Sequence, residues 1–303
     1  MGNYFDVENN EIVTEEEYYQ HEFIDTSDRT VYFKKSLNDY KYFPENNICD
    51  FKYKNIAVKQ FDELRKKYPY DKISKLNNNF ERALAAMDWM GEHSYYHGYS
   101  QLKSRNSIEI INNYFDKGFP GAINCYQQSI VLSDILCSLG IYTIPVWITV
   151  NVVDKENVKF YGNGNVHVVV HAYIDEYKKW VMLDPSYNAY LSNRQKRIMN
   201  LIDFKEAYSN NGDIILSHYK LNGDCDRFKD SYIENTGIMT FRMELKQDDA
   251  YYHLVPEGLD FADYVIHIWK NDSESRRNEI KNIVDNYKYI SIEEFLSVPE
   301  LIQ

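Results

Sequence analysis

The chain has 303 residues, 44% of them hydrophobic, which is enough for one large domain or two smaller ones with a substantial core. Its 34 Lys and Arg against 46 Asp and Glu give a net charge of −12, which argues against nucleic acid and against an anionic membrane surface as partners. No run approaches the ~20 apolar residues of a membrane helix, and the start lacks a signal-peptide pattern, so the sequence predicts a cytoplasmic protein.

The first part of the chain is predicted to pass from short strands and loops, over residues 1–54, into helices at 55–67, 74–92 and 107–115. In the second helix Ser74 is the expected N-cap. Apolar residues then recur at three- and four-residue steps, as on the buried face of a helix: Leu76, Phe80, Ala83, Leu84, Met87 and Met90.

A loop rich in turn residues, 118–124, leads into a strongly predicted helix from Cys125 to Leu139. Gly140 follows, at a position where a left-handed cap is favoured. Residues 141–153 contain many β-branched side chains and predict a strand.

The rest of the chain is predicted to contain mainly strands. Residues 166–174 and 180–183 are expected to form a hairpin, and residues 238–245 and 251–255 two further strands. Residues 272–287 have a helical pattern.

No linker divides the chain, so we expect one compact unit. Its core is predicted at residues 75–195, with residues 1–74 and 196–303 packed on that core as flanking segments.

Four cysteines are present: Cys49, Cys125, Cys137 and Cys225. None forms a C-x-x-C pair, which argues against a thiolate zinc site, and all four are expected to be free thiols. Cys125 is a candidate nucleophile because it begins a predicted helix, where unpaired N–H groups and the helix dipole favour a thiolate. The alternative for any of them is a small buried hydrophobic side chain, which suits Cys137, late in the same helix.

Two histidines lie on one face of the strand 166–174, because alternate residues of a strand point to the same side. His167 and His171 share this face, whereas the even positions are all apolar and are expected to face the core. Four residues of strand span about 13 Å, too far for two ligands of one metal ion, so no metal site is predicted. No acidic loop suits calcium either, and no cofactor is expected.

Asp184 ends the partner strand of this hairpin, where its carboxylate could orient an imidazole. An Asp before Pro is also typical of a simple turn. If Tyr173 pairs with Trp180, Asp184 lies opposite Val169 and both histidines are diagonal neighbours, so alternation alone does not decide between them. In chain order, Cys125, a histidine and Asp184 form a candidate triad with an activated thiol.

At this point the sequence resembles the transglutaminase-like superfamily of papain-related cysteine enzymes, over about residues 85–190. The motifs that carry the resemblance occur in the family's order: Trp89, His93–Gly98, Gly121–Cys125, Ser129–Leu136, Leu139–Ile141, the histidine strand and Trp180–Pro185.

The resemblance implies an α+β fold in which a helix bearing the Cys packs on an antiparallel β-sheet bearing the His and the Asp. It implies the triad Cys125, His167 and Asp184, because the family's catalytic histidine opens its strand about 13 residues before the Trp of the next one, as His167 stands before Trp180. His167 also follows a glycine-rich loop at the start of its strand, where its imidazole ring is expected to reach a cleft. His171 is then expected to be a supporting group. The chain departs from the family at His171, at Tyr173 and after Ile141, where a common basic residue is absent.

The sequence therefore predicts a bacterial-type cysteine protease: an amide or peptide hydrolase that forms a thioester and acts on a protein or peptide. A protein-crosslinking transglutaminase, or a binding module without turnover on the same fold, are the alternatives.

Overall fold

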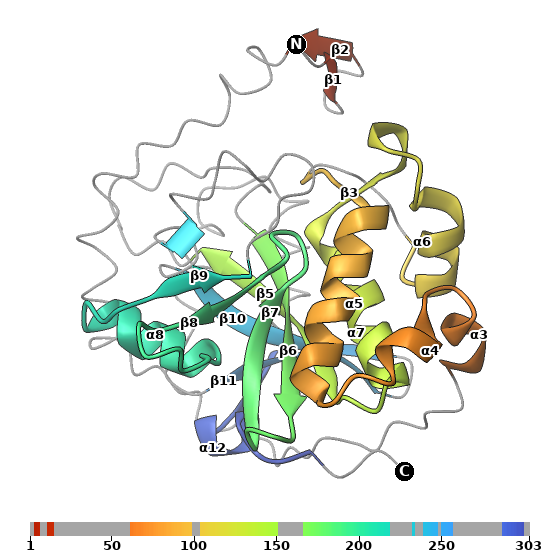
Figure 1. Ribbon diagram of the computed structural model, residues 1–303. Helices are drawn as coiled ribbons and strands as arrows, with labels where there is room; N and C mark the ends of the chain where they lie inside the picture. The colour runs from red at the N-terminus through yellow and green to blue at the C-terminus, as the bar shows by residue number, and fades with distance from the viewer. Residues whose placement is uncertain are drawn as a thin grey trace.

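A computed structural model describes residues 3–6, 11–14, 61–98, 104–150, 166–218, 232–233, 239–247, 250–256 and 287–299. The protein has an α+β fold in which helices pack on a large, mostly antiparallel sheet (Figure 1). This arrangement agrees with the expected fold class at the level of helices on an antiparallel sheet.

Eight strands form the main sheet, in the order β12-β11-β10-β5-β6-β7-β8-β9. Neighbouring strands are antiparallel except β11 and β12, which are parallel. The strands are β5 (Thr143–Val150), β6 (Val166–Ile174), β7 (Lys179–Asp184), β8 (Ala189–Ser192), β9 (Ile215–Ser217), β10 (Met239–Gln247), β11 (Ala250–Pro256) and β12 (Tyr287–Ile290).

The longest helices, α5 and α7, pack against each other, and α7 also contacts β5 and β6. The described helices are α3 (Asp62–Arg65), α4 (Tyr70–Ile73), α5 (Asn79–His93), α6 (Ser107–Tyr114), α7 (Cys125–Ser138), α8 (Leu201–Ser209) and α12 (Ile292–Phe295), with a 3₁₀ turn, η2, at Phe119–Gly121. Two small sheets pair β1 (Asn3–Asp6) with β2 (Glu11–Thr14) and β3 (Tyr95–Tyr96) with β4 (Ala122–Ile123).

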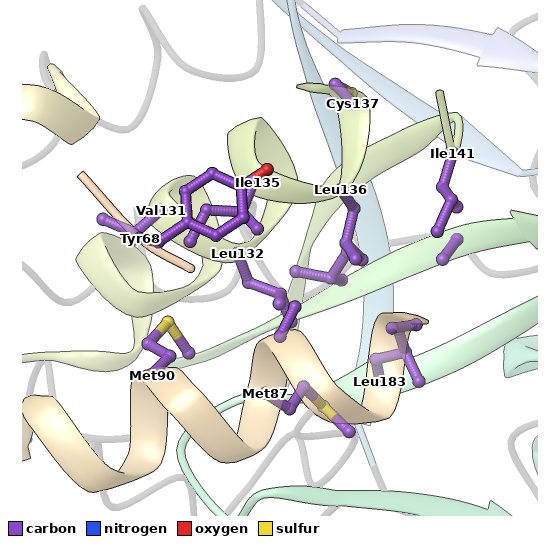
Figure 2. Packing of buried hydrophobic residues seen from close by; sticks show 14 of the residues in the cluster. Tyr68, Met87, Met90, Val131, Leu132, Ile135, Leu136, Cys137, Ile141 and Leu183 are labelled. Atoms are coloured by element: carbon purple, nitrogen blue, oxygen red, sulfur yellow. The ribbon is translucent and has the colours of Figure 1, made fainter. Parts of the chain in front are cut away.

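The first hydrophobic cluster lies between these helices and one face of the sheet. Met87 and Met90 of α5 pack in one cluster with Leu132 and Leu136 of α7 and Leu183 of β7 (Figure 2). All five side chains are fully buried, and each contributes ~1.5–3 kcal/mol of transfer free energy. This packing holds α7, and so its first residue, Cys125, in a fixed place against the sheet.

A second hydrophobic cluster covers the opposite face of β6 and β7. Trp180 and Val169 are joined there by Phe204 of α8, Met243 of β10 and Phe295 of α12. The even positions Val170, Ala172 and Ile174 face the first cluster, as expected, and the odd face of the histidine strand proves to be covered as well. Segments distant in sequence cover the other face as well, and both faces of the strand are buried.

Most predicted elements are found, with shifted ends. Helix α6, α7 and strand β6 agree with their predicted ranges to within a residue, and Gly140 takes the expected positive φ, at 84°. Strands β10 and β11 match the two strands expected there. Of the helix expected at 272–287, only Tyr287 lies within the described residues, and it begins β12.

The start of α5 was predicted wrongly at Ser74. Ser74 ends the short helix α4, and the N-cap of α5 is Asn78, whose side-chain oxygen accepts a hydrogen bond from the backbone N–H of Glu81 at 2.8 Å. Both residue types are good caps, and the interrupting turn over 74–78 decided between them. The pattern of residues after Pro185 was too weak to predict β8, α8 and β9, which the structure shows there.

Candidate active site

Cys125 is the first residue of α7, and its thiol is free. The helix begins there because Asn124 caps it: the Asn124 side-chain oxygen accepts a hydrogen bond from the N–H of Gln127 at 3.1 Å. The residue is 8% exposed, so the sulfur lies just below the protein surface. The positive end of the helix dipole stabilises negative charge on a sulfur in this position.

The segment before Cys125 is held by a short parallel pairing. Tyr96 pairs with Ile123, and the N–H of His97 donates to the Ile123 carbonyl at 3.0 Å. Gly121 is required by close packing, because a Cβ atom there would lie 2.3 Å from the carbonyl oxygen of Tyr114. The turn that delivers the chain to Cys125 therefore has little freedom.

A buried hydrogen bond fastens α7 to the histidine strand. The hydroxyl of Ser129, one turn after Cys125, donates to the carbonyl of Val168 at 2.8 Å. Val168 is the residue after His167. This bond and the packing of α7 on β6 fix the Cys125 backbone relative to that of His167.

The register of the β6–β7 hairpin determines which histidine meets Asp184. Tyr173 pairs with Trp180, and the ladder runs to Val170 and Leu183. One further step places Asp184 beside Val169, diagonal to both histidines. Of the two, His167 makes the contact: its Nε2 lies 2.7 Å from Oδ2 of Asp184.

The Asp184 carboxylate is buried, at 1% exposure, and both of its oxygens accept hydrogen bonds. Oδ2 accepts from His167 and from the hydroxyl of Tyr232, at 2.6 Å. Oδ1 accepts from the backbone N–H groups of Ser186 and Tyr187, at 3.0 and 3.3 Å. The sequence left open whether Asp184 forms a turn or bonds to an imidazole. Its carboxylate does both, with Oδ1 in the turn and Oδ2 on the imidazole.

The imidazole of His167 connects this carboxylate to the sulfur. Because Nε2 faces Asp184, Nδ1 is the ring nitrogen left to face Cys125, which is near enough to raise the pKa of His167. Burial by itself lowers the pKa of His167, but the charge and hydrogen bond of Asp184, together with the hydrogen bond and charge of Cys125, outweigh it and raise the pKa to about 10. The ring therefore carries a positive charge at neutral pH.

His171 is not a supporting group of this arrangement, contrary to expectation. Its ring is stacked between Trp180, with centroids 4.8 Å apart, and Phe295, at 5.1 Å. It is fully buried, and neither ring nitrogen has a hydrogen-bond partner in the described part of the chain. Burial lowers the pKa of His171 to about 3, so the ring is neutral at neutral pH. The surroundings of the two histidines differ because Phe295 of α12, near the end of the chain, covers the ring of His171.

Cys137 is the small buried hydrophobic residue that its position predicted. It is 3% exposed, its thiol is 3.1 Å from the Thr143 hydroxyl, and burial raises its pKa to about 12. Cys125 and Cys137 are both free, as expected for two residues near opposite ends of one helix. Cys49 and Cys225 lie outside the described residues.

Three residues of the site were not recognised in the sequence. Ser129 fastens the helix, and Tyr187 and Tyr232 stand edge-on to the His167 ring, at 5.9 and 6.5 Å between centroids. Tyr187 follows Asp184 closely and could have been proposed from that proximity. Tyr232 lies 48 residues after Asp184, and no local pattern indicates it.

Within the described ranges, no group of three or more His, Cys, Asp or Glu side chains is arranged to hold a metal ion. No helix described in the structure has both the length and the apolar character to cross a membrane.

Comparison with known proteins gives little additional information. No family model matches the chain, and no match is found among curated proteins. Among solved structures, the chain is similar to one described as "a Putative Cysteine Protease from Cytophaga hutchinsonii", with 15% sequence identity and a TM-score of 0.28. The alignment covers 48% of this chain and 45% of the other, less than half of either. A similarity this low carries no argument about fold or activity.

Proposed function

We propose that this protein is a cysteine-nucleophile hydrolase of amide or peptide bonds, in which Cys125 is the nucleophile, His167 the acid–base group and Asp184 the residue that orients His167. The observation that supports this most strongly is the 2.7 Å contact between the His167 imidazole and the buried carboxylate of Asp184, with Cys125 near enough to the same ring to raise its pKa. Its parts come from a helix start and two strands, and they meet although they are far apart in sequence.

The chemistry follows from these contacts. In the proposed reaction the proton of the Cys125 thiol has already passed to His167, which leaves a thiolate beside the imidazolium. The thiolate sulfur attacks the carbonyl carbon of the substrate amide. As the C–N bond breaks, the imidazolium returns the proton to the leaving amine, and the acyl group remains on sulfur as a thioester. The imidazole then removes a proton from water, whose oxygen displaces the sulfur and releases the carboxylic acid.

The start of α7 also suits the oxyanion that develops during attack. The Asn124 side chain accepts from the N–H of Gln127, and the N–H of Cys125 is at the helix end, where backbone N–H groups have no acceptor inside the helix. We propose that the N–H of Cys125 donates to the oxyanion beside its own sulfur.

The substrate class is proposed to be a protein or peptide, in line with the resemblance of residues 85–190 to transglutaminase-like enzymes. The same thioester could pass to a primary amine, which would make the protein a crosslinking enzyme. The proposed catalytic core spans residues 75–195, and the flanks complete it: Tyr232 bonds directly to Asp184.

The proposal is tested by mass spectrometry with a mixed peptide library as substrate. The wild-type protein is expected to cleave peptides in H₂¹⁸O with ¹⁸O entering the new carboxylate, and to show an acylated Cys125 on rapid quenching. The variants Cys125→Ala and His167→Ala should lose both signals, whereas Cys137→Ala, which removes the other thiol of the same helix, should retain them.

Each other outcome has a defined meaning. If added pentylamine captures the acyl group faster than water does, the enzyme is a transamidase. If the wild-type protein gives no acylated Cys125, and iodoacetamide labels it no faster than an unstructured cysteine, the hydrolase proposal is wrong and the fold serves binding.

A further inference from the structure

A tyrosine from outside the predicted catalytic core bonds to the triad carboxylate. Tyr232 is 2% exposed, and its hydroxyl donates to Oδ2 of Asp184 at 2.6 Å. This is the same oxygen that receives Nε2 of His167 at 2.7 Å. The other oxygen, Oδ1, is already bonded to two backbone N–H groups.

We propose that Tyr232 is a positioning residue of the triad, whose hydroxyl shares the negative charge of Oδ2 with His167 and so limits how tightly the imidazole holds its proton. This inference rests on the proposed function, because it assigns Tyr232 a role in the proton transfer that amide cleavage requires.

The physical argument begins with competition for one acceptor. A hydrogen bond donated to a carboxylate draws on its charge, so each donor at the same oxygen weakens the attraction for the other. In a buried site this effect is large, since no water screens the carboxylate. Without the Tyr232 hydroxyl, Oδ2 would interact with the imidazolium alone, and His167 would give up its proton less readily.

A proton held too tightly is a disadvantage in the proposed reaction. The imidazolium must deliver its proton to the leaving amine, and an acid–base group works best when its pKa is near the working pH. The pKa of His167 is already raised to about 10. A second donor on Oδ2 therefore acts in the direction that favours proton return.

The aromatic packing around the ring shows that Tyr232 is held in place. Tyr187 and Tyr232 contact each other at 4.6 Å between centroids, and both present an edge-on arrangement to His167. The packing of the Tyr232 ring against Tyr187 and His167 thus directs its hydroxyl at the Asp184 carboxylate. The alternative is that the contact only attaches this part of the chain to the core.

The test measures the pKa of His167 directly, without a substrate. Protein labelled with ¹⁵N-histidine is titrated by NMR, and the His167 signal is assigned by its loss in His167→Gln. We compare wild type with Tyr232→Phe, and with Tyr173→Phe as a matched control. Tyr173 is a buried tyrosine of the same cluster, on the histidine strand, and its hydroxyl makes no bond to Asp184.

The proposal predicts that Tyr232→Phe raises the pKa of His167, by up to about one unit, and that Tyr173→Phe does not. Site-specific 3-fluorotyrosine at position 232 has nearly the same shape but is a stronger donor, and should lower the pKa of His167 relative to wild type. This second variant keeps the test decisive even if Tyr232→Phe is unstable.

An unchanged or lowered pKa in Tyr232→Phe, or the same shift in Tyr173→Phe, would overturn the inference and leave Tyr232 as a structural contact. The wild-type titration separates this result from failure of the proposed function. If His167 in wild-type protein titrates near the ordinary value for histidine, the Cys125–His167–Asp184 arrangement itself is refuted.

Discussion

The buried His171 should make the stability of this protein depend on pH in a window that one substitution can identify. The ring is fully buried between Trp180 and Phe295, and only its burial shifts its pKa, from 6.5 to about 3. The unfolded chain therefore binds a proton between these two values that the folded protein does not bind. The stability that comes from burying the neutral His171 ring is fully present above pH 6.5 and is lost as the pH falls towards 3.

The magnitude follows from linkage. Each pH unit in this window changes the free energy of unfolding by about 1.4 kcal/mol for one proton, so the fall from pH 6.5 to about pH 5 costs about 2 kcal/mol. His167 acts in a different window: its raised pKa stabilises the fold fully below pH 6.5 and is lost as the pH rises through about 10. The two histidines are therefore separable.

The variant His171→Phe keeps a planar ring in the stack and removes both nitrogens, and His171→Leu serves as a second replacement of different shape. Urea unfolding is followed by tryptophan fluorescence at several pH values between about 5 and 7. As the pH is lowered through this range, the free energy of unfolding of wild type should fall by about 2 kcal/mol more than that of either variant, whatever the absolute stability of the variants. Parallel curves for the three proteins would show that His171 titrates normally and would refute the reasoning.

Three further predictions concern the candidate site; the first two are read from the alkylation of Cys125 by iodoacetamide and from urea unfolding, and the third from the titration of His167. Ser129→Ala should cost about 1–2 kcal/mol of stability and slow alkylation, because the bond to Val168 that fastens α7 to the strand is lost. Ser133→Ala, a control later in the same helix, removes a bond to Thr143 of β5 and should cost stability without slowing alkylation. Equal alkylation rates in the two variants would contradict this prediction. Gly121→Ala should slow alkylation strongly because its Cβ atom would meet Tyr114. Gly118→Ala, with open space but a φ of 60°, should cost about 1–3 kcal/mol of stability through backbone strain. A normal alkylation rate in Gly121→Ala would count against a rigid turn. Asp184→Asn should lower the pKa of His167 from about 10, since the charge that raises it is removed, and a titration unchanged from wild type would exclude Asp184 as the partner.

The sequence was informative where local pattern and chemistry agree. The apolar spacing in α7, the turn-rich loop before it and the glycine after it are local signals, and they placed the start of the helix at Cys125. Alternation and β-branched residues gave the limits of the histidine strand. The start of α5 was missed because two good caps lie four residues apart and only the preceding turn distinguishes them.

From the sequence alone, then, follow the α+β class, the helix that begins at Cys125, and a candidate set of two histidines and one aspartate on paired strands. The resemblance favoured His167 of the two, but the bond of its ring to Asp184 is a feature of the tertiary structure, because it depends on hairpin register and on what covers each face of the strand. Phe295 comes from a distant segment and encloses His171 in a dry stack, while Tyr232, also distant, bonds to the carboxylate beside His167. Such contacts join chain segments that meet only on folding, so the residue pattern near either histidine does not predict them.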